Sequence, residues 1–276
     1  MSTFIGNESI DLKLTLVDSA QCFCWTETDR GYFAALNGAA VRIWQDAEGT
    51  HGEGASQSFF RHYLDLDRDY AAIAGEYAHI PAAERAIALY PGLRVLNQEP
   101  WEALLSFILS ANNNVSRIRN LVSALCRNFG REYSIDGMAV HGFPAPEVLA
   151  DCGEDELRAL GVGYRAPYLI ETARRVRDGF PVGELCCMDY DGAHKLLTSL
   201  PGVGDKVADC VLLFGCGHCS AFPVDVWVEK LLRSWFGVSC KSRKQMMCIA
   251  RERLGEHAGL LQQFLFHAAR MGDMEL

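Results

Sequence analysis

A short glycine-containing turn between two apolar stretches constrains this chain more than any other feature. The segment 200–210 reads LPGVGDKVADC, and apolar residues at helical spacing precede and follow its Pro-Gly-Val-Gly core. This periodicity predicts two helices, and the glycines predict a tight hairpin between them. The first turn of the second helix leaves backbone N–H groups unpaired, and these can bind phosphate oxygens without reading a base sequence. We therefore expect a helix-hairpin-helix element with Gly202, Gly204 and Val207 at a nucleic-acid backbone.

Two chemically useful side chains accompany the hairpin. Lys206 falls in the first turn of the second helix, and Asp225 follows Phe222-Pro223-Val224. A helix N-terminus and partial burial both disfavour an ammonium, so Lys206 is a candidate nucleophile for a sugar C1′ rather than a solvated helix lysine. Asp225 precedes an apolar helical stripe and is a good N-cap candidate. A carboxylate there would also stabilise oxocarbenium character as a glycosidic bond breaks.

The composition fits a globular protein with a local rather than a general affinity for nucleic acid. The 276 residues are 49% hydrophobic and 22% charged, which suits one large or two moderate domains. A net charge of −9 argues against indiscriminate coating of a polyanion but is compatible with a small contact patch. Without a signal-like N-terminus or an 18-residue apolar run, we expect a cytoplasmic protein with no targeting signal and no membrane partner. Eleven cysteines, an odd number, favour reduced thiols.

The hydrophobic pattern changes near residue 85, so we expect two domains, 1–84 and 85–276. Residues 11–45 alternate, with Leu12, Leu14 and Leu16 on one face, and Asn37-Gly38 is a strong hairpin signal between 31–36 and 39–45. The glycine-rich stretch 46–58 predicts a loop, and 70–77 and 81–89 predict helices covering the sheet. Beyond residue 100 the periodicity predicts about eight short helices. The following glycines fall where helices should stop: Gly130, Gly161, Gly179, Gly215 and Gly237.

The expected fold class is α+β, with an N-terminal antiparallel β-sheet domain and covering helices, followed by a mainly α-helical body that contains the helix-hairpin-helix motif. The hairpin and Pro223-Val224-Asp225 resemble the signature of the helix-hairpin-helix DNA glycosylases. Four more segments, 19–23, 110–118, 160–166 and 262–266, resemble the 8-oxoguanine DNA glycosylase branch of that family. The resemblance spans nearly the whole chain.

This resemblance implies a bifunctional DNA glycosylase and AP lyase of base excision repair. Lys206 would form a Schiff base with the lesion sugar, Asp225 would act electrostatically, and β-elimination would follow base excision. The implied partner is double-stranded DNA containing oxidised guanine paired with cytosine, and we expect a monomer. The resemblance implies no required cofactor, although a monovalent cation could be held by hairpin carbonyls.

The resemblance also implies a pocket for the base, which must leave the duplex to be reached. Its expected residues are Ala20, Cys210, Phe214, Gln262 and Phe266. Phe266 and Cys210 would sandwich the ring, and Gln262 would pair with its Watson–Crick edge. Ala20 stands where the family has a glycine whose carbonyl accepts the N7–H that distinguishes 8-oxoguanine from guanine. Phe214 stands where the family has a methionine.

A second group is implied for the gap in the duplex and the orphaned cytosine. Asn112 would enter the gap, Tyr164 would wedge beside it, and Arg117 with Arg165 would hold the cytosine. Trp227 replaces a histidine that faces phosphate in the animal enzymes, which suggests a bacterial or archaeal branch with a different phosphate grip.

Other functions remain to be weighed against this one. A noncatalytic helix-hairpin-helix DNA-binding module would need neither Lys206 nor Asp225, and a monofunctional glycosylase for alkylated bases would not require the lysine. The sequence Cys216-Gly217-His218-Cys219 invites a metal interpretation, but no second cysteine pair follows at zinc-ribbon spacing. We therefore expect no metal site.

Overall fold

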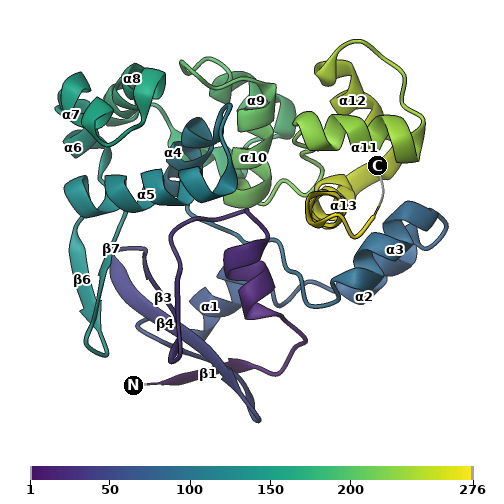
Figure 1. Cartoon of the computed structure of the whole chain (residues 1–276), viewed down its shortest axis with the longest axis horizontal. Coiled ribbons are helices and arrows are strands. Elements are labelled where there is room, and N and C mark those ends of the chain that lie inside the picture. The colour runs from purple at the N-terminus through teal and green to yellow at the C-terminus, as the bar shows by residue number, and fades with distance from the viewer. Residues whose placement is uncertain (1, 275–276) are drawn as a thin grey trace.

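The computed structural model describes residues 2–274 and has a small sheet domain beside a larger helical body (Figure 1). Five antiparallel strands form the sheet in the order β1-β5-β4-β3-β2. Asn37 and Gly38 form the turn between β3 and β4 with φ of 47° and 74°, as this hairpin type requires, so the hairpin prediction is confirmed. The strands are β1 Thr3–Gly6, β2 Thr26–Thr28, β3 Gly31–Leu36, β4 Ala39–Asp46 and β5 Gly49–Glu53.

The predicted strand at Leu12, Leu14 and Leu16 is wrong. Residues 12–18 are helical, and Leu14–Asp18 form a turn of π-helix, η1, whose first N–H, on Leu14, donates to Asp11 Oδ1 at 2.9 Å. Leucines at alternate positions are buried here because positions four apart also share a helix face. Three leucines are too few to distinguish the two-residue period of a strand from the 3.6-residue period of a helix, which is why a strand was predicted.

The stretch 46–58 is also not a loop, because it contains β5 and the start of α1, Gln57–Tyr63. Its glycines have a packing role: a Cβ on Gly52 would lie 2.4 Å from a ring carbon of Phe60. Phe60 is fully buried and belongs to the core between the sheet and α1. The glycine content of this stretch therefore wrongly predicted a loop. At position 52 glycine is required by close packing against Phe60.

Helices α2, Tyr70–Tyr77, and α3, Pro81–Leu89, have the predicted bounds but a different partner. They pack beside α13, Ala258–Met271, and not over the sheet (Figure 1). Ile73 and Ala83 belong to the core of the helical body, and the Tyr77 hydroxyl donates to the Leu254 carbonyl at 2.7 Å. The proposed boundary near residue 85 therefore crosses a segment that packs with the helical body.

The helical body contains ten α-helices among the described residues beyond position 99, where about eight were expected. It also contains an unpredicted two-stranded hairpin, β6 Glu132–Ile135 and β7 Met138–His141. The helices are α4 Pro100–Ser110, α5 Val115–Phe129, α6 Pro146–Ala150, α7 Glu154–Ala159, α8 Ala166–Arg177, α9 Tyr190–Leu197, α10 Asp205–Cys216, α11 Val226–Phe236, α12 Arg243–Leu254 and α13. The fold is thus α+β with a mainly helical body.

One predicted helix end is misplaced. Gly215 lies inside α10, which ends at Gly217 in the left-handed conformation, φ 70°. A Cβ on Gly215 would come within 3.1 Å of Ala103 and Pro100 of α4, so this glycine permits two central helices to approach closely. Within residues 2–274, no helix combines the length and apolar character needed to cross a membrane.

Candidate active site

The hairpin joins α9 to α10 and has the predicted geometry. Gly202 has φ 78°, and a Cβ there would lie 2.5 Å from the Tyr168 ring, so the turn requires glycine on both grounds. Gly204 is the exposed N-cap of α10, with open space where a Cβ would lie. The Val207 side chain is buried, but its N–H belongs to the first turn of α10. The hairpin therefore offers unpaired backbone donors beside Lys206.

A small pocket brings both candidate catalytic residues together with all five predicted base-contacting residues. Its cavity volume is about 50 Å³, room for one or two water molecules, so its walls must move apart to admit a purine. The α10 residues meet the loop that follows η1, the N-terminus of α11 and one face of α13. The lining residues are Ala20, Phe107, Lys206, Cys210, Phe214, Pro223, Asp225, Gln262, Gln263 and Phe266.

Lys206 is held at the pocket by the end of α4. Its Nζ donates to Ser110 Oγ at 2.9 Å and lies 5.3 Å from the centroid of the Phe107 ring. Ser110 in turn donates to the Phe107 carbonyl at 2.8 Å. These contacts fix the amine in a half-buried position, where a substrate atom can replace the serine as its neighbour.

Asp225 caps α11 as predicted and also lines the pocket. Its Oδ1 accepts hydrogen bonds from the N–H groups of Trp227 and Val228, both at 2.9 Å. The two bonds fix the carboxylate and stabilise its negative charge, while Oδ2 takes part in neither. Capping and an electrostatic role are therefore compatible in one side chain.

The predicted base-contacting side chains include one buried acceptor without a hydrogen-bond partner, on Gln262, and several apolar surfaces. Gln262 is 4% exposed, and its Oε1 has no hydrogen-bond partner in residues 2–274. A buried acceptor of this kind is costly unless a ligand supplies a donor. Phe214 stacks on Phe107 with ring centroids 5.4 Å apart. Burial raises the pKa of Cys210 to about 12, so its thiol is neutral and offers a packing surface rather than a nucleophile.

Ala20 adopts the backbone conformation that glycine normally supplies. Its φ is 61°, in the left-handed region. Its carbonyl accepts no hydrogen bond from any other described residue. With alanine at position 20, the loop therefore still has a carbonyl oxygen without a hydrogen-bond donor in a residue that lines the pocket.

The residues predicted for the orphaned base form a second cluster. Asn112 is exposed with φ 50°, and Tyr164, which is 50% exposed, donates its hydroxyl hydrogen to the Ala111 carbonyl at 3.1 Å. Arg117 is exposed, and its Nη2 donates to the Gly161 carbonyl at 3.2 Å. Loops that are about 50 residues apart in the sequence therefore meet here.

Arg165 differs from the expectation that it would hold the cytosine. Its side chain is buried, and its Nε and Nη2 both donate to the Ala111 carbonyl. Nη2 also donates to the Asn112 carbonyl at 3.1 Å and Nη1 to Val162 at 3.3 Å. Because its donors are used by the backbone, Arg165 positions the Asn112 loop here and offers little to a base.

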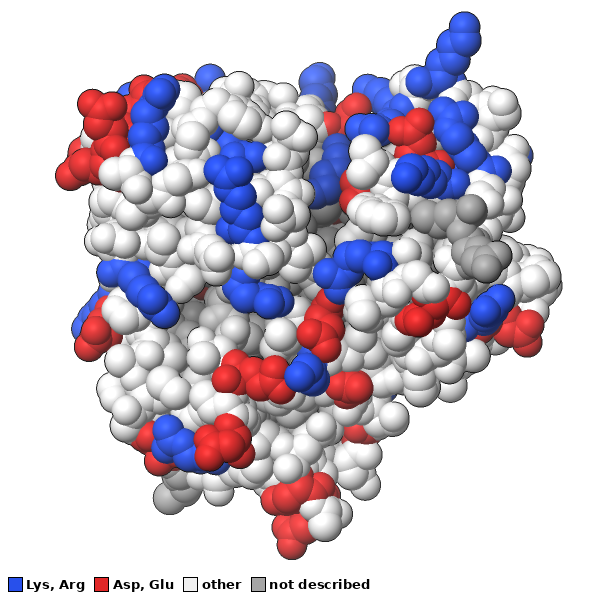
Figure 2. Space-filling view, in the orientation of Figure 1, with Lys and Arg blue, Asp and Glu red and all other residues white. Residues whose placement is uncertain are grey.

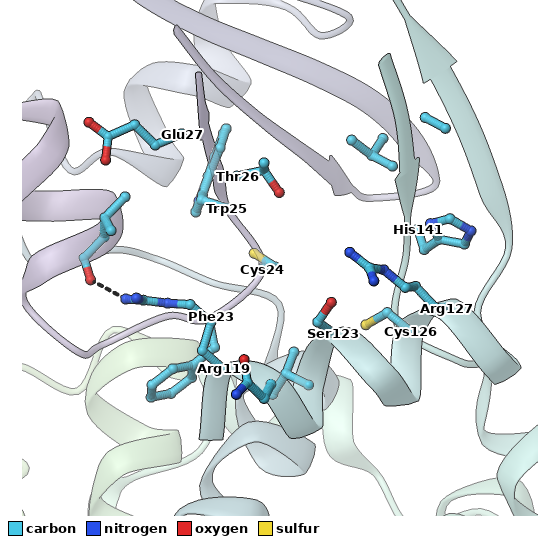
Figure 3. Close-up of a pocket in the computed structure, with 15 residues that line it drawn as sticks. Phe23, Cys24, Trp25, Thr26, Glu27, Arg119, Ser123, Cys126, Arg127 and His141 are labelled. Atoms are coloured by element: carbon cyan, nitrogen blue, oxygen red, sulfur yellow. Dashed lines mark hydrogen bonds between the residues drawn. The ribbon is translucent and has the colours of Figure 1, made fainter. Parts of the chain in front are cut away.

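A larger hollow, of about 410 Å³, lies between α5, β2 and β7 (Figure 3). It contains neither Lys206 nor Asp225, and its labelled residues include Cys24, Arg127 and His141. Its Phe23 contacts Phe107 of the smaller pocket edge to face, with centroids 6.2 Å apart. Within the described part of the chain, no group of three His, Cys, Asp or Glu residues could hold a metal ion.

Four residues of the site were not predicted from the sequence: the lining residues Phe107, Pro223 and Gln263, and Ser110, which accepts the hydrogen bond from Lys206. Phe107 and Ser110 lie in a helix that is buried on all sides, so helical periodicity does not distinguish them from core residues. Gln263 had a signal, because it is a second amide in the middle of the buried helix α13. A polar side chain at such a position needs a hydrogen-bond partner.

Comparison with known proteins gives two matching family models that together cover most of the chain. Residues 3–104 match the 8-oxoguanine DNA glycosylase N-terminal domain, and residues 105–256 match the HhH-GPD superfamily of base excision DNA repair proteins. Among curated relatives, the "Probable N-glycosylase/DNA lyase" of Methanothermobacter thermautotrophicus is 37% identical over 67% of this chain and 66% of its own. The N-glycosylase/DNA lyase of Saccharomyces cerevisiae is 42% identical over 58% of this chain and 46% of its own. The chain thus spans about half to two thirds of these relatives.

The match to solved structures extends over almost the full length. The 8-oxoguanine glycosylase/lyase of Clostridium acetobutylicum, in complex with double-stranded DNA containing cytosine opposite 8-oxoguanine, superposes with a TM-score of 0.90 at 31% identity. The similarity covers 97% of this chain and 94% of that one. The same enzyme without DNA gives a TM-score of 0.87 over 94% and 93% of the two chains.

Proposed function

Because the chain belongs to the HhH-GPD superfamily of base excision DNA repair proteins, we propose that it is a bifunctional DNA glycosylase and β-lyase that excises 8-oxoguanine paired with cytosine. The observation that carries this proposal is the shared pocket of Lys206, Asp225, Ala20, Gln262 and Phe266. A noncatalytic binding module would need neither the amine of Lys206 nor the carboxylate of Asp225 at this pocket.

In the first step the neutral amine of Lys206 attacks C1′ of the extruded nucleotide. The new bond joins Nζ to C1′, the bond from C1′ to N9 of the base breaks, and its electron pair leaves with the base, which takes up a proton. Positive charge develops on the sugar, and the Asp225 carboxylate stabilises it. Lys206 is an α10 residue and Asp225 is the N-cap of α11, so the packing of these two helices sets the geometry of the step.

The covalent sugar then supports the lyase reaction. Ring opening converts the Lys206 adduct to a protonated Schiff base, which makes the hydrogens at C2′ acidic. Loss of one C2′ proton expels the 3′ phosphate as the leaving group and cleaves the strand, and water later releases the lysine. A monofunctional glycosylase would stop before this stage, so the lysine is the residue that separates the two alternatives.

Recognition of the lesion rests on two acceptors at the pocket. The Ala20 carbonyl has no partner in residues 2–274 and suits the N7–H that 8-oxoguanine has and guanine lacks. The buried Gln262 Oε1 suits the donors on the Watson–Crick edge. Phe266 offers a ring face on which the base can stack, a contact worth about 1 to 3 kcal/mol and comparable to the cost of extrusion.

The partner in this proposal is duplex DNA, with Asn112 entering the gap and Arg117 reaching the orphaned cytosine. Such an enzyme works where the genome is, which in a prokaryote is the cytoplasm. No cofactor is required for the chemistry. The carbonyls of Pro201 and Gly202 accept no hydrogen bond from the described residues, so they fit a monovalent cation that would add positive charge at the hairpin.

The test is Lys206→Gln, assayed on a duplex with 8-oxoguanine opposite cytosine. We expect a folded protein that still binds this duplex but neither excises the base nor forms a covalent adduct under borohydride. The unmutated protein should form the adduct, and peptide mapping should find it at Lys206. Lys13→Gln, at an exposed lysine paired with Glu27 in the sheet domain, is the matched control and should retain both activities. Trapping at a different lysine would overturn the assignment.

A further inference from the structure

The segment from Val17 to Gln21 contains the end of η1 and the turn after it, and we call it the base-reading loop. Most of its carbonyl groups accept hydrogen bonds from side chains elsewhere in the fold. Arg119 of α5 donates to the Val17 carbonyl at 2.8 Å, the dashed bond in Figure 3. Arg270 of α13 donates to the Asp18 carbonyl, and Gln263 of α13 donates to the Ser19 carbonyl at 2.7 Å.

The pattern resumes on the other side of Ala20. The Gln98 side chain donates to the Gln21 carbonyl at 2.8 Å. Gln21 is itself fully buried, and its own amide bonds Thr15, Ser19, Arg94 and Leu96 at 2.8 to 3.0 Å. Of the five consecutive carbonyls, the four flanking ones therefore receive a side-chain hydrogen bond. The carbonyl of Ala20, a residue that lines the pocket, receives none from the described residues.

These hydrogen bonds require polar side chains to be buried, which costs free energy. Gln263 and Gln98 are 2% and 7% exposed. Burial lowers the pKa of Arg270, whose Nε has no hydrogen-bond partner in residues 2–274 and whose guanidinium lies 5.9 Å from the centroid of the Phe266 ring. Burial of an arginine with an unsatisfied nitrogen destabilises the fold. A loop that needed only to be closed would be closed more favourably by apolar packing.

We propose that Arg119, Gln263 and Arg270 are positioning residues for lesion discrimination. They hold the base-reading loop so that the left-handed Ala20 aims its one unpaired carbonyl into the base pocket, and they do not touch the reacting atoms. We call these three residues the clamp. This proposal rests on the proposed function, because the clamp positions the Ala20 carbonyl, the proposed acceptor of the 8-oxoguanine N7–H. It also accounts for a loop that keeps its conformation with alanine in place of glycine.

The test compares two activities of the same variants. Gln263→Leu and Arg270→Met remove the donors at similar size and should lower single-turnover excision of 8-oxoguanine by roughly tenfold, as expected for one misplaced buried hydrogen bond. The ratio of rates between 8-oxoguanine and an analogue lacking the N7–H should fall toward one. Cleavage of a preformed abasic site needs Lys206 and Asp225 but no base. In Arg270→Met, at a residue outside the pocket lining, this cleavage should stay within about twofold of the unmutated rate. Arg270→Lys should restore part of the ratio.

Controls and an independent readout keep the two proposals separable. Gln45→Leu removes a comparable amide, which donates to the Ile10 carbonyl at 3.0 Å in the sheet domain, and should leave the ratio unchanged. Amide hydrogen exchange of residues 17–22 should accelerate in Gln263→Leu and not in Gln45→Leu. Unchanged exchange, or equal losses of excision and abasic-site cleavage, would overturn the clamp. If the unmutated protein does not excise 8-oxoguanine, the proposed function fails, while the exchange measurement still decides whether the clamp exists.

Discussion

Asp225 has two tasks that a single substitution can separate. Asparagine caps a helix about as well as aspartate but carries no charge. In Asp225→Asn we therefore expect the free energy of unfolding to change by less than about 0.5 kcal/mol, while single-turnover excision falls by roughly 100-fold or more because the sugar cation loses its counter-charge. Asp225→Ala should lose both, with about 1 kcal/mol of stability lost through the cap. Excision at the unmutated rate in the asparagine variant would show that the charge is not used.

A substitution at Ala20 measures the free-energy cost of the left-handed backbone conformation in the base-reading loop. A non-glycine residue in the left-handed region costs roughly 1 to 2 kcal/mol, and glycine adds about 0.5 to 1 kcal/mol of chain entropy to the unfolded state. Ala20→Gly should therefore stabilise the protein by up to about 1 kcal/mol in urea denaturation and leave lesion discrimination intact. Ala124→Gly, in the middle of α5, should instead destabilise by about 1 kcal/mol. A clear loss of stability at position 20 would mean that its methyl group contributes packing.

Helices α9 and α10 are linked by a buried polar contact whose contribution to the free energy of unfolding should depend on pH. The Tyr190 hydroxyl donates to Asp209 Oδ1 at 2.6 Å, while Asp209 Oδ2 has no partner in residues 2–274. Burial is the main reason that the pKa of Asp209 is raised from 3.8 to about 7. The neighbouring His194 Nε2 lies 4.0 Å from Asp209, and burial lowers the pKa of this histidine. Charged neighbours on α10 and α12 are Asp205, Lys244 and Arg251.

The sign of the effect follows from the proton count. Between about pH 4 and pH 7, folded Asp209 keeps a proton that the unfolded chain has released, so its contribution to the free energy of unfolding falls as the pH rises. Asp209→Asn removes this dependence, so the stability of the variant relative to the unmutated protein should increase by about 2 kcal/mol from pH 5 to pH 7. His194 is present in both proteins, and its opposite contribution cancels in the difference. Urea denaturation at the two pH values measures it, and a pH-independent difference would contradict the assignment.

How well the sequence predicted each element depended on how local its determinants are. The Asn37-Gly38 turn, the glycine hairpin and the Asp225 cap depend on a few neighbouring residues, and all three are confirmed. The packing of α2 and α3 on α13, and the contact that requires Gly215, depend on residues far apart in sequence. Hydrophobic periodicity alone contains no information about such partners.

The same distinction holds at the site. Pocket residues such as Gln262 could be located because they lie in recognisable segments, and the structure brings them together. Arg165 lies in an equally recognisable segment, but its side-chain direction is decided by the Ala111 and Asn112 carbonyls of a distant loop. The clamp on the base-reading loop could not be predicted for this reason, since each of its hydrogen bonds to the loop joins residues at least 102 positions apart.

For the whole molecule, a net charge of −9 must be reconciled with the proposed partner, duplex DNA, which is a polyanion. Figure 2 shows lysine and arginine side chains gathered over α11 and α12 and along the centre of the helical half. Aspartate and glutamate are more frequent over the lower, sheet half. The hairpin adds neutral backbone donors, which bind phosphate without adding positive charge. If the proposed function is right, DNA binding therefore depends on a small local footprint and not on the net charge of the molecule.

This arrangement predicts a weak salt dependence of DNA binding. Each cation that neutralises a phosphate contributes about −0.9 to the slope of log K against log salt. With about three or four lysine and arginine side chains at phosphates of the duplex, the slope should lie between about −2 and −4. Fluorescence anisotropy with a lesion duplex between 50 and 200 mM salt, about the range over which such slopes are read, measures it. Because Arg117 is proposed to contact the cytosine base and not a phosphate, Arg117→Gln should lower the affinity with little change in the slope. Arg174→Gln on α8, whose guanidinium donates to the Ala150 carbonyl, should change neither. A slope steeper than about −6 would require a broad basic surface, and DNA binding would then not depend on the hairpin as its main contact.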